Sequence, residues 1–543
     1  MRRSVSRPSP PLPVIHPWPP AHGRRHRSVS FFQGRLGSLL LGLPLLLAGG
    51  CRAAEPPSLL DPPEPLHWPV GRPPAIDPQQ PVLWVGLAAH LRPPAPLVFK
   101  AAAGLLTLVA PDGARYQAPR LELHWRLEPM EPPLRLRRQV LGPFASYESA
   151  EQAADRWRQT GARVVIARPL DWEVWAPLEA PEPPAELGSV RRLERDVSQR
   201  AVLELRRADG AVRLAGPLTL EAPQGLHWQS GVFAGPFRLQ PDAHGSWSLV
   251  EKVPLERYLQ GVVPHEIGAA SPPAALAAQA VLARTWALRN LQRFEVDGYH
   301  LCADTQCQVY ADPRHAGAAV LQAIASTRHQ VLSWQGEPIH AVYHATNGGI
   351  SAGFEEVWSG APLPYLRARV DGPAPVQARF PLPLAAAQLP AVLASRSFIG
   401  ADHPRFRWSR TVEAAQLRQA VQPLAPGLGL PTEVRVLERG PSGRVMALEI
   451  RDGDADRVVL RRDAIRRNLR QLPSTLFLVE PQGPGRWRFV GGGFGHGAGL
   501  SQAGAIDLAA RGWRLEAILQ HYYPGTTLQP LSSLQPEDPG GAP

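Results

Sequence analysis

Prolines gather in a few stretches of this 543-residue chain, and they limit where folded domains can form. Proline fixes its φ angle and lacks a backbone N–H, so segments dense in proline do not build helices or central strands. Their distribution predicts a proline-rich tether at residues 51–95, a linker at 179–199 and a disordered tail at 529–543. Two folded regions remain between them: a small α/β or β-rich region at 96–178 and a larger domain at 200–528.

The first 50 residues predict an export signal. Leu36–Gly50 is a 15-residue apolar run, too short to span a membrane and interrupted by Pro44. The arginines before it and the small residues at its end are typical of a signal peptide at residues 1–50, and they favour a lipoprotein leader with a lipid anchor on Cys51. A chance leucine run in a disordered start is the alternative. Export would place the protein in the periplasm or cell envelope, with membrane attachment only through Cys51.

The net charge of +11 does not by itself indicate a nucleic-acid-binding protein. Residues 1–54 hold eight arginines and no acid, so +8 of this charge belongs to the leader. The remaining +3 is modest, and its sign suits an anionic cell wall. Nothing in the sequence resembles a nucleic-acid-binding motif, and we expect no nucleic-acid partner.

Hydrophobic periodicity predicts an α+β fold with mixed or antiparallel strands and a few helices. Short runs at 200–250 alternate apolar and polar residues between turn signals, which indicates antiparallel strands. A buried stripe from Leu276 to Phe294, preceded by the N-cap Ser271, indicates an amphipathic helix. Shorter helices are expected at Leu500–Arg511 and Leu515–His521.

The segment 138–175 carries a strand–helix–strand pattern. Strand-like Val140–Phe144 precedes a helix with small residues and Trp157 on one face, and Ala162–Ile166 is the next strand. This pattern resembles about half of the sporulation-related repeat (SPOR-like), a small peptidoglycan-binding module. A generic βαβ-type fragment is the alternative interpretation.

Five separated motifs distinguish the larger domain. They are VPLERYLQGVVPHE with AAQAVLART (253–285), CADTQCQVY (302–310), YHATNGG (343–349), GFGHGAGLSQ (493–502) and HYYPGT (521–526). Their order resembles the SpoIID/LytB (stage II sporulation protein D) family over residues 230–528. The resemblance implies a lytic transglycosylase that cleaves peptidoglycan glycan strands. The alternative is a non-catalytic, peptidoglycan-binding enhancer of a cell-wall amidase.

The resemblance assigns the catalytic acid to Glu266. Glycosidic cleavage needs a carboxylic acid that is still protonated near neutral pH. Glu266 follows the apolar run Val262–Pro264 and precedes a helix, where partial burial would raise its pKa. One carboxyl group suffices for a lytic transglycosylase, because the 6-hydroxyl of the sugar attacks and forms a 1,6-anhydro end. A surface or helix-dipole role is the alternative for a glutamate at such a position.

Other motif residues are candidates for binding the glycan or lining the cleft, although each could instead pack in the core. They are Arg284, Gln308, Tyr310, Tyr343, His344, His496, Ser501 and Gln502. A Ser501–His496 nucleophile pair is not favoured, because no orienting acid is evident. Tryptophans such as Trp286 and Trp358 could offer sugar platforms.

No cofactor is required by this chemistry, but one metal site is conceivable. His300, Cys302, Cys307 and His315 have spacings that a structural zinc ion could use. A Cys302–Cys307 disulfide, or two buried thiols, are the competing interpretations.

Overall fold

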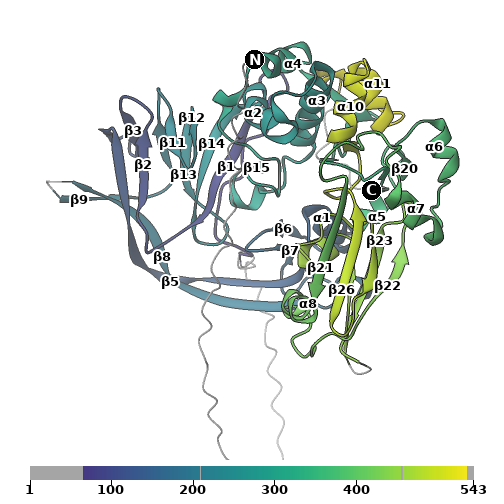
Figure 1. Cartoon of the computed structure of the whole chain (residues 1–543). Helices are drawn as coiled ribbons and strands as arrows, with labels where there is room; N and C mark the ends of the chain where they lie inside the picture. Colours follow the sequence, from purple (N-terminus) through teal and green to yellow (C-terminus); the bar gives the residue numbers. More distant parts are fainter. Residues whose placement is uncertain (1–64, 208–209, 454–455, 535–543) are drawn as a thin grey trace, which may run out of the picture. The chain divides into compact units, whose positions relative to one another are not determined.

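The computed structural model describes residues 65–207, 210–453 and 456–534 (Figure 1). The predicted signal peptide and the candidate lipid-bearing Cys51 lie outside these residues. The α+β fold is confirmed, since helices and mostly antiparallel sheets are both present. In the described part of the chain, no helix combines the length and apolar character needed to cross a membrane.

One seven-stranded sheet joins the start of the described chain to the segment around residue 250. Its only parallel pair is β1 with β15; the other neighbours are antiparallel. In sheet order its strands are β15 (Leu301–Cys302), β1 (Val82–Leu91), β14 (Trp247–Pro254), β13 (Phe237–Pro241), β10 (Leu218–Glu221), β3 (Leu106–Val109) and β4 (Arg115–Ala118).

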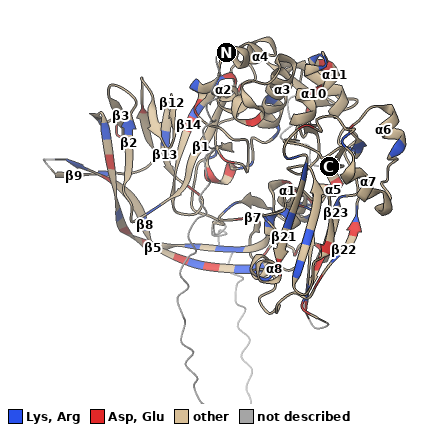
Figure 2. Ribbon diagram, viewed as in Figure 1, with Lys and Arg blue, Asp and Glu red and all other residues tan. Residues whose placement is uncertain are grey.

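A second sheet is built on two long strands, β5 (Arg120–Phe144) and β8 (Arg191–Arg207). Figure 2 shows basic and acidic residues along both strands, and the cross-strand pair Arg137–Glu194 is an ion pair of 3.4 Å. β5 pairs with β2 (Leu97–Ala101) at its start and with β7 (Trp172–Ala176) at its end. The other strands are β6 (Val165–Ala167), β9 (Gly210–Leu214), β11 (Leu226–Trp228) and β12 (Gly231–Phe233).

The helix α1 (Tyr147–Arg158) follows β5 and packs against β7. The order of elements in 138–175 is therefore strand, helix, strand, with a further strand closing the segment. The likeness of this segment to the sporulation-related repeat stays a prediction.

Three predicted irregular segments contain regular structure. The tether predicted at 51–95 is wrong from Val82, where β1 begins, and the linker at 179–199 is wrong from Arg191, where β8 begins. The disordered tail at 529–543 is wrong as far as residue 534, because β28 (Thr527–Pro530) pairs with β16 (Gln330–Trp334). In each case a strand that is distant in the sequence supplies the backbone hydrogen-bond partners. Local composition does not reveal such a partner. Residues 535–543 lie outside the described part.

The helix α3 (Pro273–Arg289) lies at the centre of a helical layer. It begins close to the predicted start, but its N-cap is Pro272, because Ser271 donates its hydroxyl to Ile267 O, and it ends at Arg289 instead of near Phe294. The predicted single buried stripe is also wrong, since the helix is buried on nearly all sides from Ala275 to Ala287. Its many alanines let neighbouring helices approach closely, and Figure 1 shows these helices grouped around it. The neighbours are α2 (Leu255–Val263), α4 (Ala318–Ser326), α10 (Gln502–Ala510) and α11 (Leu515–Tyr522).

Residues 352–499 form an insert with cores of its own. Two three-stranded sheets pack together with α8 (Ala414–Val421) and α9 (Asp463–Asn468). Their strands are β21 (Arg407–Glu413), β26 (Arg486–Gly492), β25 (Phe477–Pro481), β22 (Glu433–Arg439), β23 (Val445–Arg451) and β24 (Arg457–Arg461). The short helices are α5 (Phe354–Val357), α6 (Ala374–Arg379) and α7 (Leu389–Ala394), and the last two pack in a separate apolar cluster.

The two ends of this insert lie side by side. β18 (Tyr343–His344) pairs in parallel with β27 (Leu500–Ser501). Isolated bridges join Thr346 to Phe494 and Ala352 to Ala498. Gly348 and Gly493 meet here so closely that a side chain at either would collide with the other's backbone.

Candidate active site

A cleft of about 470 Å³ contains Glu266. Its walls come from four distant parts of the chain: the start of α1, the loop at 305–309, the segment around Tyr343, and the insert. The volume falls in the range of small-ligand sites. Glu266 is one of four carboxyl groups in the lining, and the others are Glu148, Glu356 and Asp463.

Glu266 lies in a π-helical turn, η2 (Pro264–Gly268), directly after α2. Its Oε1 accepts a 2.8 Å hydrogen bond from the backbone N–H of Val309. The side chains of Tyr343 and Gln502 also lie within hydrogen-bonding reach. Burial raises the pKa of Glu266, and these three donors only partly oppose that effect. The carboxyl group thus keeps its proton to a higher pH than an exposed glutamate does.

Tyr343 connects Glu266 to the loop beside it. Its hydroxyl donates a 2.7 Å hydrogen bond to Gln308 Oε1, and the same hydroxyl is within reach of the Glu266 carboxyl. Gln308 is itself fixed by Ala283 O and the hydroxyl of Tyr258. The Tyr343 hydroxyl has one hydrogen, which it can donate either to Gln308 Oε1 or to the Glu266 carboxylate. Tyr343 can therefore switch its hydrogen bond to Glu266 when that group loses its proton.

Gln502 approaches Glu266 from the start of α10. Its amide also donates to Gln279 Oε1 at 3.3 Å. Gln308, Tyr343 and His496 line the cleft, as expected for glycan-binding candidates. The structure therefore brings these four candidates together around the acid.

Four other candidates are placed elsewhere, and their predicted contact with the glycan is corrected. Arg284 is fully buried and bonds Glu256, while the Tyr310 hydroxyl donates to Glu251. His344 is buried with Nδ1 against Ala498 O. Ser501 caps α10 by accepting the N–H of Gly504. These four side chains make hydrogen bonds within the protein that stabilise the walls of the cleft, and they do not line it.

The candidate zinc ligands are not brought together. Cys302 and Cys307 form a disulfide, the competing interpretation from the sequence. His300 accepts from Trp84 N and bonds Pro74 O, so both of its ring nitrogens are engaged. His315 instead faces His265, 3.4 Å between Nδ1 and Nε2. In the described residues no group of three or more His, Cys, Asp or Glu side chains is arranged to hold a metal ion.

His496 lies in the cleft as a neutral ring. Burial and the neighbouring Arg466 lower its pKa to about 3. Its Nε2 bonds Tyr343 O at 2.9 Å, and its Nδ1 accepts the N–H of Ala498. Trp358 packs against it with ring centroids 5.1 Å apart. With both nitrogens occupied, His496 shapes the wall and does not act as a base for Ser501.

Sequence reasoning missed an arginine-rich wall from the insert. Arg462, Arg466 and Arg467 all line the cleft, as does Asp463. The run LRRDAIRRNLR at 460–470 was the available signal. Nothing local in it indicates that it reaches a glutamate about 200 positions earlier in the chain.

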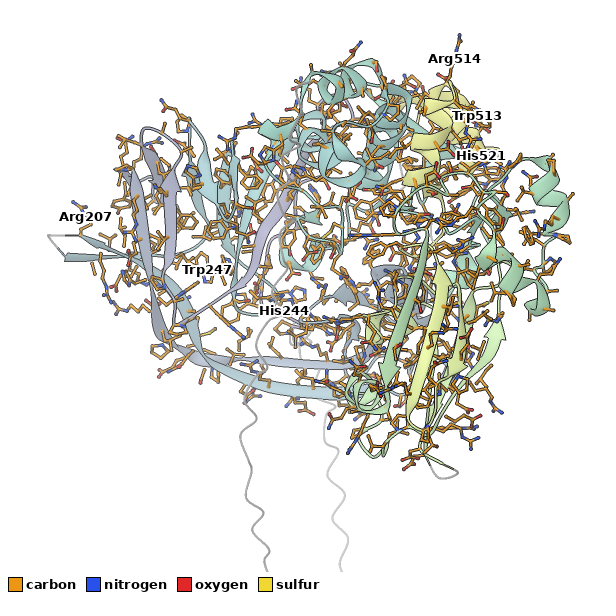
Figure 3. The ribbon with its side chains drawn as sticks, in the orientation of Figure 1. Arg207, His244, Trp247, Trp513, Arg514 and His521 are labelled. Carbon is orange, nitrogen blue, oxygen red and sulfur yellow. A yellow bond between two sulfur atoms is a disulfide. The ribbon has the colours of Figure 1, made fainter. Side chains whose placement is uncertain are left out.

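The C-terminal motif HYYPGT stabilises the fold. His521 Nε2 bonds the buried Asp371 at 2.8 Å, and Tyr522 donates to the same carboxylate. The Tyr523 hydroxyl donates to Val342 O, next to Tyr343. Figure 3 shows His521 beside Trp513 on the α11 side of the molecule, with ring centroids 5.7 Å apart.

Comparison with known proteins agrees with these motifs. Residues 243–334 match the family model SpoIID, Stage II sporulation protein, and residues 352–499 match a domain of unknown function (DUF8618). The chain is 29% identical over 294 residues to Stage II sporulation protein D of Bacillus subtilis (strain 168), covering 51% of this chain and 75% of the relative. The same-named protein of Bacillus amyloliquefaciens is 29% identical over 299 residues, covering 52% and 76%.

A further relative, the Amidase enhancer of Bacillus subtilis (strain 168), is 27% identical over 303 residues, covering 50% of this chain and 40% of the relative. The family-model match falls on the part of the chain that holds η2, α3 and the disulfide loop. This segment is therefore similar to the SpoIID family of stage II sporulation proteins, and about half of the chain is similar to stage II sporulation protein D.

Proposed function

We propose that the protein is a peptidoglycan lytic transglycosylase with Glu266 as its general acid and base. The observation that carries the proposal is the Glu266 carboxyl group, which lines the cleft and whose pKa is raised by burial. A carboxyl group that stays protonated near neutral pH is the group that glycosidic cleavage needs. The SpoIID match and the named relatives fit a role in cell-wall remodelling.

The proposed reaction needs one carboxyl group used twice. Protonated Glu266 gives its proton to the glycosidic oxygen as the C1–O bond breaks, which releases the next sugar as an alcohol. The resulting carboxylate then accepts the proton of the 6-hydroxyl as O6 bonds to C1. The products are a 1,6-anhydro end and a new free hydroxyl, and no water is consumed. Donors from Val309, Tyr343 and Gln502 stabilise the carboxylate between the two steps.

Digestion of purified glycan strands, with mass analysis of the ends, tests this proposal. The wild-type protein should release fragments with 1,6-anhydro ends. Glu266→Gln keeps the shape of the side chain but cannot supply the proton, so it should lose this product while glycan binding survives. Cleavage retained in Glu266→Gln would disprove the assignment of the acid.

The second candidate is a peptidoglycan-binding protein that stimulates a cell-wall amidase without cleaving glycan. The relative named Amidase enhancer favours it. Wild-type protein that binds glycan, yields no anhydro ends and speeds an added amidase would support this function over the first. Under either function we propose that the protein is exported and meets peptidoglycan in the periplasm or cell envelope, with Cys51 as the site of any lipid anchor.

A further inference from the structure

The insert contributes an arginine, Arg466, whose guanidinium makes no hydrogen bond to any residue that the structure describes. Arg462 donates to Glu355 O at 2.9 Å, and Arg467 pairs with Asp171. Arg466 lines the same cleft, yet its buried Nε has no hydrogen-bond partner among the described residues. That Nε is shielded from solvent, so a ligand in the cleft would bond the terminal nitrogens of Arg466, which also make no hydrogen bond among the described residues. A guanidinium whose donors lack acceptors is suited to a ligand that supplies them.

Arg466 is held in place by the way α9 docks on α1. Asp463, at the first position of α9, accepts hydrogen bonds from Ser146 at 2.5 Å and Ser149 at 2.8 Å. Ile465 is fully buried in the core of the insert. With Asp463 and Ile465 anchored before it and Arg467 paired with Asp171 after it, the backbone of Arg466 is fixed relative to the cleft.

The surroundings of Arg466 favour an anionic ligand. Its acidic neighbour Asp463 is already bonded to the two serines. Glu356, another acid of the cleft, accepts from Gly353 and Ser442. His496 is neutral, since its pKa is lowered to about 3. Asp463 attracts Arg466 electrostatically, yet no acid of the described residues accepts a hydrogen bond from the Arg466 guanidinium, so its donors remain available for an anionic ligand.

We propose that Arg466 forms a subsite for a carboxylate carried by the glycan strand. The planar guanidinium matches a carboxylate with two parallel hydrogen bonds, which sugar hydroxyls do not offer. In peptidoglycan such a carboxylate is either the lactyl group of a peptide-free muramic acid or a group on an attached peptide. The subsite lies outside the SpoIID match, in the insert. The inference rests on the proposed glycan binding in this cleft.

Binding measurements in a Glu266→Gln background separate recognition from cleavage. The ligands are peptide-free glycan oligosaccharides, the same oligosaccharides with the lactyl carboxylate converted to a neutral methylamide, and peptide-bearing oligosaccharides. Adding Arg466→Gln should lower affinity for the peptide-free ligand at least tenfold and leave affinity for the amide unchanged. If the amide instead loses as much affinity as the acid, or if neither the acid nor the peptide-bearing ligand loses any, the subsite is refuted. The peptide-bearing ligand tells which carboxylate is bound: a similar loss there points to the peptide.

Two variants guard against a trivial loss of structure. Arg470→Gln removes an exposed arginine two residues beyond α9, outside the cleft, and should bind every ligand as the parent does. Arg466→Lys keeps the positive charge but loses the paired N–H donors of the guanidinium. It should therefore retain part of the preference for the acid ligand over the amide ligand. If no ligand binds the parent protein, the proposed function fails together with the subsite. If ligands bind but Arg466→Gln discriminates acid from amide as the parent does, only the subsite fails.

Discussion

Replacing Arg284 by methionine should destabilise the protein and leave the glycan site intact. Arg284 is fully buried, and its guanidinium donates to both oxygens of Glu256, at 2.9 and 2.8 Å, and to Gln330 O at 3.0 Å. Methionine fills a similar space but leaves the Glu256 carboxylate and the Gln330 carbonyl without their donor. Breaking a buried pair by removing one partner costs about 3–5 kcal/mol.

Urea denaturation followed by circular dichroism measures this loss of unfolding free energy. The double variant Arg284→Met/Glu256→Gln should recover most of it, because no unpaired charge is then left behind. Arg328→Met, at an exposed position, is the matched control and should stay within about 0.5 kcal/mol of wild type. If Arg284→Met keeps the wild-type unfolding free energy but loses glycan affinity, Arg284 contacts the ligand and the structural role is wrong.

Two further predictions concern the acid and its loop. Tyr343→Phe removes a donor that lowers the pKa of Glu266, so that pKa should rise and the alkaline limit of glycan cleavage should move to higher pH; an unchanged pH profile would contradict the contact. Replacing both Cys302 and Cys307 by serine opens a short loop and should lower the unfolding free energy by about 2 kcal/mol, whereas a chelator should not change the wild-type melting temperature. A melting temperature that falls when the chelator is added would show that the wild-type protein binds a structural metal ion.

Local signals sufficed for the acid and for the central helix. Glu266 follows an apolar run inside a distinctive motif, and prolines followed by a long run of alanine and leucine indicate where α3 begins. The cap at Ser501 also has a local signal, since serine before a helix is a preferred N-cap. Its membership of the GFGHGAGLSQ motif predicts a cleft residue instead, and the structure shows the cap.

Only the ends of the long strands had such a signal, at Val140–Phe144 in β5 and from residue 200 in β8. The middle of β5 contains several prolines and alternating charges, features that predict a loop, and it is a strand because β8 pairs with it. The register of that pair shifts between Pro129 and Leu134, where prolines do not need to donate. The position of the arginine wall beside Glu266 could not be predicted either, because only the tertiary fold brings these two distant parts of the chain together.

The paired ends of the insert have a consequence for how such proteins diversify. The chain leaves the SpoIID part near Tyr343 and returns at Leu500, and one parallel strand pair closes the seam. An inserted segment whose two ends lie side by side can be replaced by another without changing the path of the rest of the chain. A different insert can therefore be grafted at this seam, which would change the part of the cleft wall that the insert supplies and leave Glu266 and the helices around it unaltered.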